Sequence, residues 1–182
     1  MEAGLLIVRV VLGGLMAAHG AQKLFGWFGG PGLAGSEGWL ESIGLRPARV
    51  YAVITGLAEF VGGALLILGF ITPVGAAAVV GVMFVAIATV HWRNGFFNTA
   101  GGYEFNLLII AAALALAITG PGTISIDHRA GWTLAGPEWG LAALGVAAVA
   151  AGSVLALRRL APTQERGEVS HEERLTDRPA GG

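Results

Sequence analysis

The chain has 182 residues, of which 54% are apolar and 13% charged, with a formal net charge of -1. Together with a mean hydropathy of +0.69, this composition excludes an ordinary soluble domain and predicts a membrane protein. The near-neutral charge, without a basic patch interleaved with aromatic residues, excludes a nucleic-acid partner. There is no cysteine, which excludes disulfides, thiolate metal sites and thiol redox chemistry by this chain alone. Electron transfer would therefore need a bound cofactor or another subunit.

The first predicted helix runs from Ala3 to Phe25, about the ~20 residues needed to cross the hydrocarbon core of a bilayer. It carries Arg9 and lacks both a basic leading region and a small-residue cleavage motif, so it is interpreted as a retained helix rather than a signal peptide. Near its end, His19, Gln22 and Lys23 stand at positions i, i+3 and i+4. This spacing places the three polar side chains on one helix face.

A glycine-rich linker follows from Gly26 to Arg49. Within it, Ser36 to Ile43 forms a short helical turn with Trp39 and Leu40 on one side, which predicts an interfacial position. The second helix runs from Val50 to Phe70, and Thr72-Pro73 starts the third at once, which continues to Trp92. Such a short connection makes these two helices an antiparallel pair.

A second linker, from Arg93 to Glu104, combines glycines with interface aromatics and leads into a fourth helix from Phe105 to Thr119. A turn at Gly120-Pro121-Gly122 follows, after which Ser125 and Asp127 are expected to cap the local backbone. A fifth apolar run extends from Trp139 to Leu157. The tail from Ala161 to Gly182 has too little apolar surface to fold alone and is predicted to be disordered.

These elements predict an all-α membrane protein with a four-helix transmembrane bundle and a fifth C-terminal transmembrane helix. The expected units are a four-helix domain over 1–127, an extracytoplasmic turn and fifth helix over 128–159, and a cytoplasmic tail over 160–182. Positive residues in short loops stay cytoplasmic, and the two long linkers and the end of the last helix hold most of them: Lys23, Arg46, Arg49, Arg93, Arg158 and Arg159. The opposite side has only Arg129 outside a helix. The N-terminus is therefore expected outside and the tail inside a plasma membrane.

Glu59 stands in the middle of the second helix, where a charged carboxylate costs about 2.5 to 3.5 kcal/mol. It is therefore expected to be paired, protonated or in contact with water. Counting helical rise places Glu59 roughly 13 Å from the inner surface, which makes His19 a closer partner than Arg9. However, Arg9, His19 and Lys23 project within an arc of roughly 80°, so one helix face offers three cations to a single acid.

Two further ionisable residues, His91 and Glu104, are expected at the level of Gln22 and Lys23. One interpretation is a polar pocket in the inner half of the bundle that binds a polar head group or relays protons. The other is a purely structural ion pair of Glu59 with one cation, with His91 and Glu104 as ordinary interfacial residues. The candidate ligand-binding set is Arg9, His19, Gln22, Lys23, Glu59, His91 and Glu104. No metal-binding or hydrolytic motif is present, so neither a metal site nor a catalytic residue is assigned.

Several of these positions, taken in chain order, form a recognisable pattern. It consists of Arg9, His19-Gly20, Gln22-Lys23, Glu59 with Gly62-Gly63, Gly69 with Thr72-Pro73, and Gly120-Pro121-Gly122 with Ser125 and Asp127. This pattern, over about Leu5 to Asp127, resembles the DoxX family of small bacterial membrane proteins, and Gly95 to Glu104 is similar to one of its subfamilies. The fifth helix and the tail lie outside the family's usual four-helix unit.

The resemblance implies a membrane subunit of a redox or oxidative-stress system that binds quinone between the first four helices. His19 or Lys23 would hydrogen-bond a quinone carbonyl, and Glu59 would supply protons. If the protein takes part in an enzyme, it would at most be a subunit of an oxidoreductase. Its expected partners are the lipid bilayer, soluble redox proteins and further copies of the same chain. The alternatives are a non-enzymatic scaffold for soluble partners and a binder or carrier of a small lipophilic molecule. A cavity lined by the polar residues favours a bound guest, whereas a closed ion pair favours the scaffold.

Overall fold

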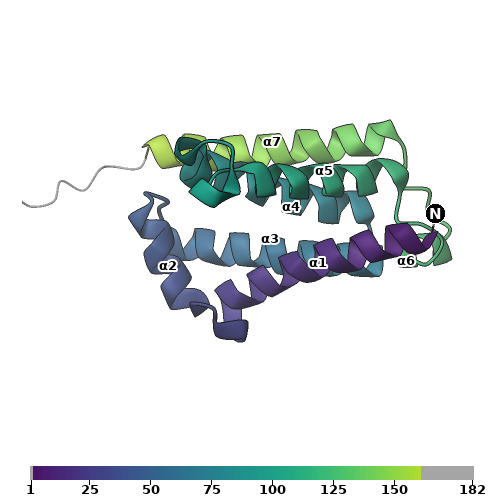
Figure 1. The fold of residues 1–182 in the computed structure, drawn as a ribbon, viewed down its shortest axis with the longest axis horizontal. Coiled ribbons are helices and arrows are strands. Elements are labelled where there is room, and N and C mark those ends of the chain that lie inside the picture. The colour runs from purple at the N-terminus through teal and green to yellow at the C-terminus, as the bar shows by residue number, and fades with distance from the viewer. Residues whose placement is uncertain (1, 161–182) are drawn as a thin grey trace, which may run out of the picture.

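The computed structural model describes residues 2–160 as a bundle of helices, with no strand in that range (Figure 1). The helices are α1 (Glu2–Phe25), α2 (Gly32–Ser42), α3 (Ala48–Leu68), α4 (Thr72–Ala86), α5 (Glu104–Thr119), α6 (Ile126–Arg129) and α7 (Pro137–Leu160). Short 3-10 turns occupy Trp27–Gly29, Trp92–Asn94 and Asn98–Ala100, and a π-helical segment occupies Ile87–His91. The all-α fold class is confirmed. The predicted disordered tail lies outside the described residues.

All five predicted apolar runs form helices. Four are long and apolar enough to cross a membrane: α1, α3, the stretch Thr72–Asn94 that continues α4, and α7. The fifth, α5, is apolar but shorter, with 16 residues. Gly69 ends α3 in a left-handed conformation, and Thr72-Pro73 begins α4 immediately afterwards. This tight turn makes α3 and α4 antiparallel neighbours, as predicted.

Helix α4 lies at the centre of the described bundle and contacts α3, α5 and α7, while α1 packs along α3. In Figure 1, α5 and α7 run side by side on one side of the bundle and α1 and α3 on the other. The main core gathers around Val79, Val80 and Met83 of α4 and is completed by Leu66 and Leu116. The end of the bundle that holds α6 and the N-terminus is called the α6 end below, and the opposite end is called the α2 end.

The contact between α1 and α3 depends on glycines that let the two backbones approach closely. A Cβ atom added at Gly13 would stand 2.5 Å from the Gly63 carbonyl oxygen, and one at Gly20 would stand 2.6 Å from that of Gly56. Gly13 therefore faces Gly63 and Gly20 faces Gly56. This pairing fixes the register of the two helices and thereby the height of every polar group on them.

Replacing Gly20 with alanine is expected to destabilise the bundle by about 1 to 3 kcal/mol, because the added methyl group overlaps the α3 backbone. The matched control is Gly14→Ala, since a Cβ atom at Gly14 meets nothing within 4 Å. The control is expected to be neutral or to gain up to about 1 kcal/mol from better helix propensity. Unfolding in mixed detergent and dodecyl sulfate micelles measures both changes, and equal effects of the two substitutions would contradict the proposed close contact.

Candidate functional site

Arg9 is almost fully buried at the α6 end, with 1% of its surface exposed. Its Nε donates to the Leu66 carbonyl at 3.1 Å and its Nη2 to the Ile67 carbonyl at 2.9 Å, while Nη1 donates to the Pro121 carbonyl. The last carbonyls of a helix have no partner within the helix. Arg9 therefore caps the C-terminal turn of α3 and holds the Gly-Pro-Gly turn against it. Its predicted place in a ligand-binding pocket is not supported by these contacts.

Asp127 is fully buried beside this cap. Its Oδ1 accepts from the Ile71 amide at 2.7 Å, and its Oδ2 accepts from the Thr72 amide at 3.0 Å and the Thr72 hydroxyl at 2.8 Å. Asp127 thus supplies from α6 the N-cap that α4 lacks in its own sequence. The prediction that it caps the backbone after Gly122 is wrong, because the turn carries it back over α4. Ser125 does cap locally, since its Oγ accepts from the His128 amide at 3.2 Å.

Lys23 and Glu59 form an ion pair in the α2 half of the molecule, with Nζ 2.6 Å from Oε1. The Glu59 side chain is only 4% exposed, and the Lys23 side chain is 26% exposed. The second carboxylate oxygen, Oε2, is buried without a hydrogen-bond partner among the described residues. The carboxylate end of the pair, on α3, is therefore buried, whereas the lysine end, on α1, is partly exposed.

The sequence left the partner of Glu59 open among the three cations of α1 and ranked His19 above Arg9, and the structure pairs Glu59 with Lys23. The glycine contacts place Glu59 at about the backbone level of His19, because Gly20 faces Gly56 and Phe60. Side chains, however, lean towards the N-terminus of their own helix, and α1 and α3 are antiparallel. Lys23 and Glu59 therefore lean towards each other across one helical turn, whereas His19 and Glu59 lean apart.

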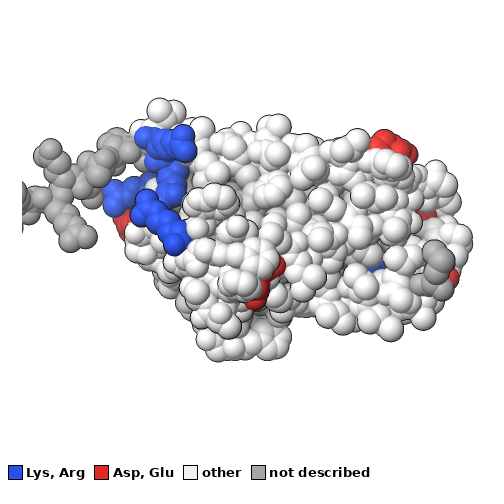
Figure 2. All heavy atoms as spheres, turned by 45° about the horizontal axis from the view of Figure 1, so that its top comes forward, with Lys and Arg blue, Asp and Glu red and all other residues white. Residues whose placement is uncertain are grey.

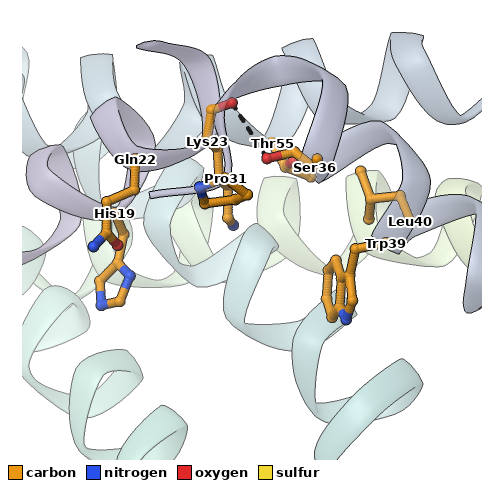
Figure 3. A pocket seen from close by; sticks show the side chains of 9 residues that line it. His19, Gln22, Lys23, Pro31, Ser36, Trp39, Leu40 and Thr55 are labelled. Atoms are coloured by element: carbon orange, nitrogen blue, oxygen red, sulfur yellow. Dashed lines mark hydrogen bonds between the residues drawn. The ribbon is translucent and has the colours of Figure 1, made fainter. Parts of the chain in front are cut away.

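A cavity of about 360 Å³ lies beside the lysine, between α1, α2 and α3. Its walls are His19, Gln22, Lys23, Pro31, Gly35, Ser36, Trp39, Leu40 and Thr55. Figure 3 shows the α1 side chains His19 and Gln22 on one side of it and the α2 side chains Trp39 and Leu40 on the other. The dashed line is the bond that Ser36 Oγ donates to the Lys23 carbonyl at 3.2 Å, which holds α2 against α1. An apolar hollow with a few convergent polar groups is typical of a small-molecule site.

The structure places the two remaining candidates away from this cavity. The His91 ring Nδ1 lies 2.7 Å from the Gly101 carbonyl oxygen, at the end of the π-helical segment. It thereby fastens the linker between α4 and α5. Glu104 begins α5, and its backbone amide donates to the Phe96 carbonyl at 2.9 Å. Neither residue belongs to the cavity walls.

Of the seven candidates, His19, Gln22 and Lys23 therefore line the cavity, and Glu59 is joined to it through Lys23. Reasoning from the sequence missed Ser36, Trp39 and Thr55. The signal that could have found Ser36 and Trp39 is Pro31, at which the chain turns back so that α2 lies over the polar face of α1. No periodic pattern specifies how a short interfacial helix folds over its neighbours.

Comparison with known proteins gives the geometry a family context. The family model described as DoxX matches residues 4–92, which include every residue of the cavity wall. The inner membrane protein YqjF of Escherichia coli strain K12 is 31% identical over 129 residues, or 70% of this chain and 92% of that protein. The Bacillus subtilis strain 168 protein named "Putative oxidoreductase CatD" is 30% identical over 131 residues, or 69% of this chain and 86% of that protein.

No solved structure matches the chain at a comparable level of significance. The relatives are nevertheless covered over nearly their whole length, and the matched residues form the membrane helices that surround the cavity. By these sequence matches, the chain belongs to the DoxX family of integral membrane proteins.

Proposed function

We propose that this protein is the quinone-binding membrane subunit of a redox system, with the quinone ring in the cavity beside Lys23. One observation carries the proposal: a buried carboxylate holds the Lys23 ammonium at the wall of a cavity of about 360 Å³. That volume falls in the range of small-molecule sites, about 300 to 1,000 Å³. A structural ion pair without a guest would be closed by packing, whereas this pair borders open space.

The donors around the cavity suit a quinone, whose carbonyl oxygens only accept hydrogen bonds. The Lys23 ammonium carries three N–H groups, and its Nζ lies in contact with Glu59 Oε1. The remaining N–H groups are available to a carbonyl at the cavity wall. Trp39 offers an aromatic surface to the ring, and Gln22 and His19 provide further polar groups on the opposite side.

Glu59 has two roles in this proposal. Its Oε1 keeps the Lys23 side chain extended towards the cavity, and it balances the ammonium charge inside the membrane. Its Oε2, which is buried without a hydrogen-bond partner in the part of the chain that the structure describes, would be a proton-accepting position next to the site. A bound quinone would supply the two-electron chemistry that a chain without cysteine lacks. A redox assignment also agrees with the oxidoreductase name of the Bacillus subtilis relative.

The distribution of charge favours a cytoplasmic α2 end. Lys and Arg side chains gather at one end of the molecule in Figure 2, the end at which α7 stops in Figure 1. The α2 end carries Lys23, Arg46, Arg49, Arg93, Arg158 and Arg159. By the positive-inside rule this end faces the cytoplasm and the N-terminus faces outward. A soluble redox partner would then reach the cavity from the cytoplasmic side, past α2.

The test measures quinone binding to the purified full-length protein in lipid nanodiscs, with the quenching of tryptophan fluorescence as the readout. A benzoquinone without a tail is expected to quench the fluorescence of Trp39. In the Trp39→Phe variant most of this quinone-dependent quenching should be absent. Lys23→Gln should raise the Kd at least about tenfold, because a bond from a charged donor contributes ~1.5 to 3 kcal/mol.

The matched control for the lysine is Arg49→Gln, which removes a positive charge at the same end from a residue outside the cavity wall. It should leave the Kd unchanged. Absence of saturable binding to the wild type, for both benzoquinones and naphthoquinones, would overturn the proposed function. An equal loss of affinity in both variants would show that bulk charge and not Lys23 governs binding.

A further inference from the structure

A second, apolar depression on the outside of the bundle adjoins the cavity beside Lys23. A small space of about 40 Å³ lies between them. It shares Lys23, Trp39, Leu40 and Thr55 with the cavity beside Lys23. It shares Leu45, Thr55, Val82 and Val85 with the apolar depression. Thr55 borders all three, so the two larger spaces are neighbours with the small space between them.

The apolar depression, called the groove below, has a volume of about 280 Å³ and lies between α3, α4 and α7. Its α4 wall extends from Val74 to Val85, a length of about 16 Å along a helix. Its α7 wall extends from Val146 to Val154 and consists of alanine and valine. The small side chains of α7 leave an elongated hollow here instead of filling it.

We propose that the groove binds the isoprenoid tail of the same quinone whose ring occupies the cavity beside Lys23. This inference rests on the proposed function and names the ligand class more narrowly: a quinone with a long hydrocarbon tail. The ring lies against the Lys23 ammonium, the tail passes Thr55 and leaves between α3 and α4, and α7 covers it on the far side. Helix α7, which lies beyond the family match over residues 4–92, would thereby form part of the binding site.

The chemistry of the two spaces supports a single amphipathic guest. The polar groups are confined to the cavity end, at Lys23, Gln22 and His19, whereas Thr55 and Tyr51 are the only residues with a polar side-chain atom in the groove wall. A quinone has the same division, with two carbonyls on the ring and only hydrocarbon in the tail. A soluble, tailless substrate would have no use for the groove.

The experiment is photolabelling of the full-length protein in phosphatidylcholine and phosphatidylglycerol nanodiscs. The probe is a benzoquinone whose two-isoprene tail ends in a diazirine. After irradiation, peptide mapping should find the adduct on 74–85 of α4 or 146–154 of α7. An excess of unlabelled long-tail quinone should reduce this adduct by about tenfold, as expected for competition at one saturable site.

A matched pair of variants on α7 sharpens the test. Ala150 lines the groove and Ala148 does not, and both are exposed. Ala150→Phe should reduce groove labelling by about tenfold, because the ring fills the space of the tail. Ala148→Phe should leave it unchanged. An unfolding midpoint for each variant establishes that the helix is intact, and the wild-type mapping does not depend on either substitution.

Two results would overturn the tail path while leaving the proposed function in place. The first is an adduct spread over lipid-facing positions of all helices and insensitive to competitor, which would put the tail in bulk lipid. The second is labelling of the groove by a diazirine-bearing phospholipid that quinone does not displace, which would make the groove an ordinary lipid site. Failure of the tailless benzoquinone to bind the wild type would instead overturn the proposed function, and this inference with it.

Discussion

Replacing Arg9 with methionine is expected to destabilise the folded bundle by about 3 to 5 kcal/mol, because it removes several hydrogen bonds from a charged donor, each of which contributes ~1.5 to 3 kcal/mol. Methionine keeps the length and apolar character of the arginine stem but donates no hydrogen bond. The carbonyls of Leu66, Ile67 and Pro121 then lose the arginine donor, and of these the Leu66 carbonyl keeps its bond from the Gly69 amide. At ~2 to 4 °C for each kcal/mol in a chain of this size, the thermal midpoint in detergent should fall by about 10 °C.

Two controls separate the geometry of Arg9 from its charge. Arg9→Lys keeps the charge but lacks the planar fork that reaches three carbonyls, so it should recover only part of the loss. Arg129→Met removes an exposed arginine of α6 and should cost less than about 0.5 kcal/mol. A thermal midpoint for Arg9→Met within error of the wild type would mean that these bonds do not hold the α3 cap.

Lys23→Met should cost about 3 kcal/mol, because it leaves the Glu59 carboxylate buried without its partner. The estimate is taken at the low end of the usual range since the Lys23 side chain is partly exposed. Glu59→Met alone should cost less, because the lysine left behind can reach water. The double variant Lys23→Met with Glu59→Met should recover most of the stability, as is often found when a buried pair is replaced by apolar residues.

The wild type, the two single variants and the double variant together separate the effect on stability from the effect on binding. Unfolding in dodecyl sulfate micelles gives the coupling between the two residues, expected to be at least about 2 kcal/mol for groups in direct contact. The double variant should bind quinone as weakly as the Lys23→Met variant, even though its stability is close to that of the wild type. If the double variant bound quinone as the wild type does, the pair would serve only to join α1 and α3.

The helices could be predicted from the sequence because two strong physical signals coincide. Apolar runs of about membrane length specify the spans, and glycine and proline specify their ends, as at Gly69 and Thr72-Pro73. The π-helical segment Ile87–His91 was not predictable in this way. A π-helical turn has no residue signature of its own, and neither proline nor glycine marks this one.

The polar residues were identified correctly as special, but their partners were not. Arg9 and Glu59 are costly in a membrane wherever they lie, so composition alone marks them. The partners of Arg9 are the backbone carbonyls of Leu66, Ile67 and Pro121. Because every residue has such a carbonyl, the sequence does not indicate which ones Arg9 binds. The pairing of Glu59 with Lys23 rather than His19 depends on which way side chains lean, a detail that counting residues along a helix axis leaves out.

The facing glycines of α1 and α3 also limit how the cavity can change shape. Gly13 and Gly20 are seven residues apart, as are Gly56 and Gly63. Added Cβ atoms at Gly13, Gly20 and Gly63 would meet the opposite backbone, and one at Gly56 would meet the Leu24 side chain. Sliding α1 along α3 by one residue would drive side chains into these contacts, so shear between the two helices is blocked. The part of the cavity wall built by α1 and α3 therefore keeps its shape. Helix α2 is held to α1 in part by the bond from Ser36 to the Lys23 carbonyl, so this third wall is the one whose position the facing glycines leave unconstrained.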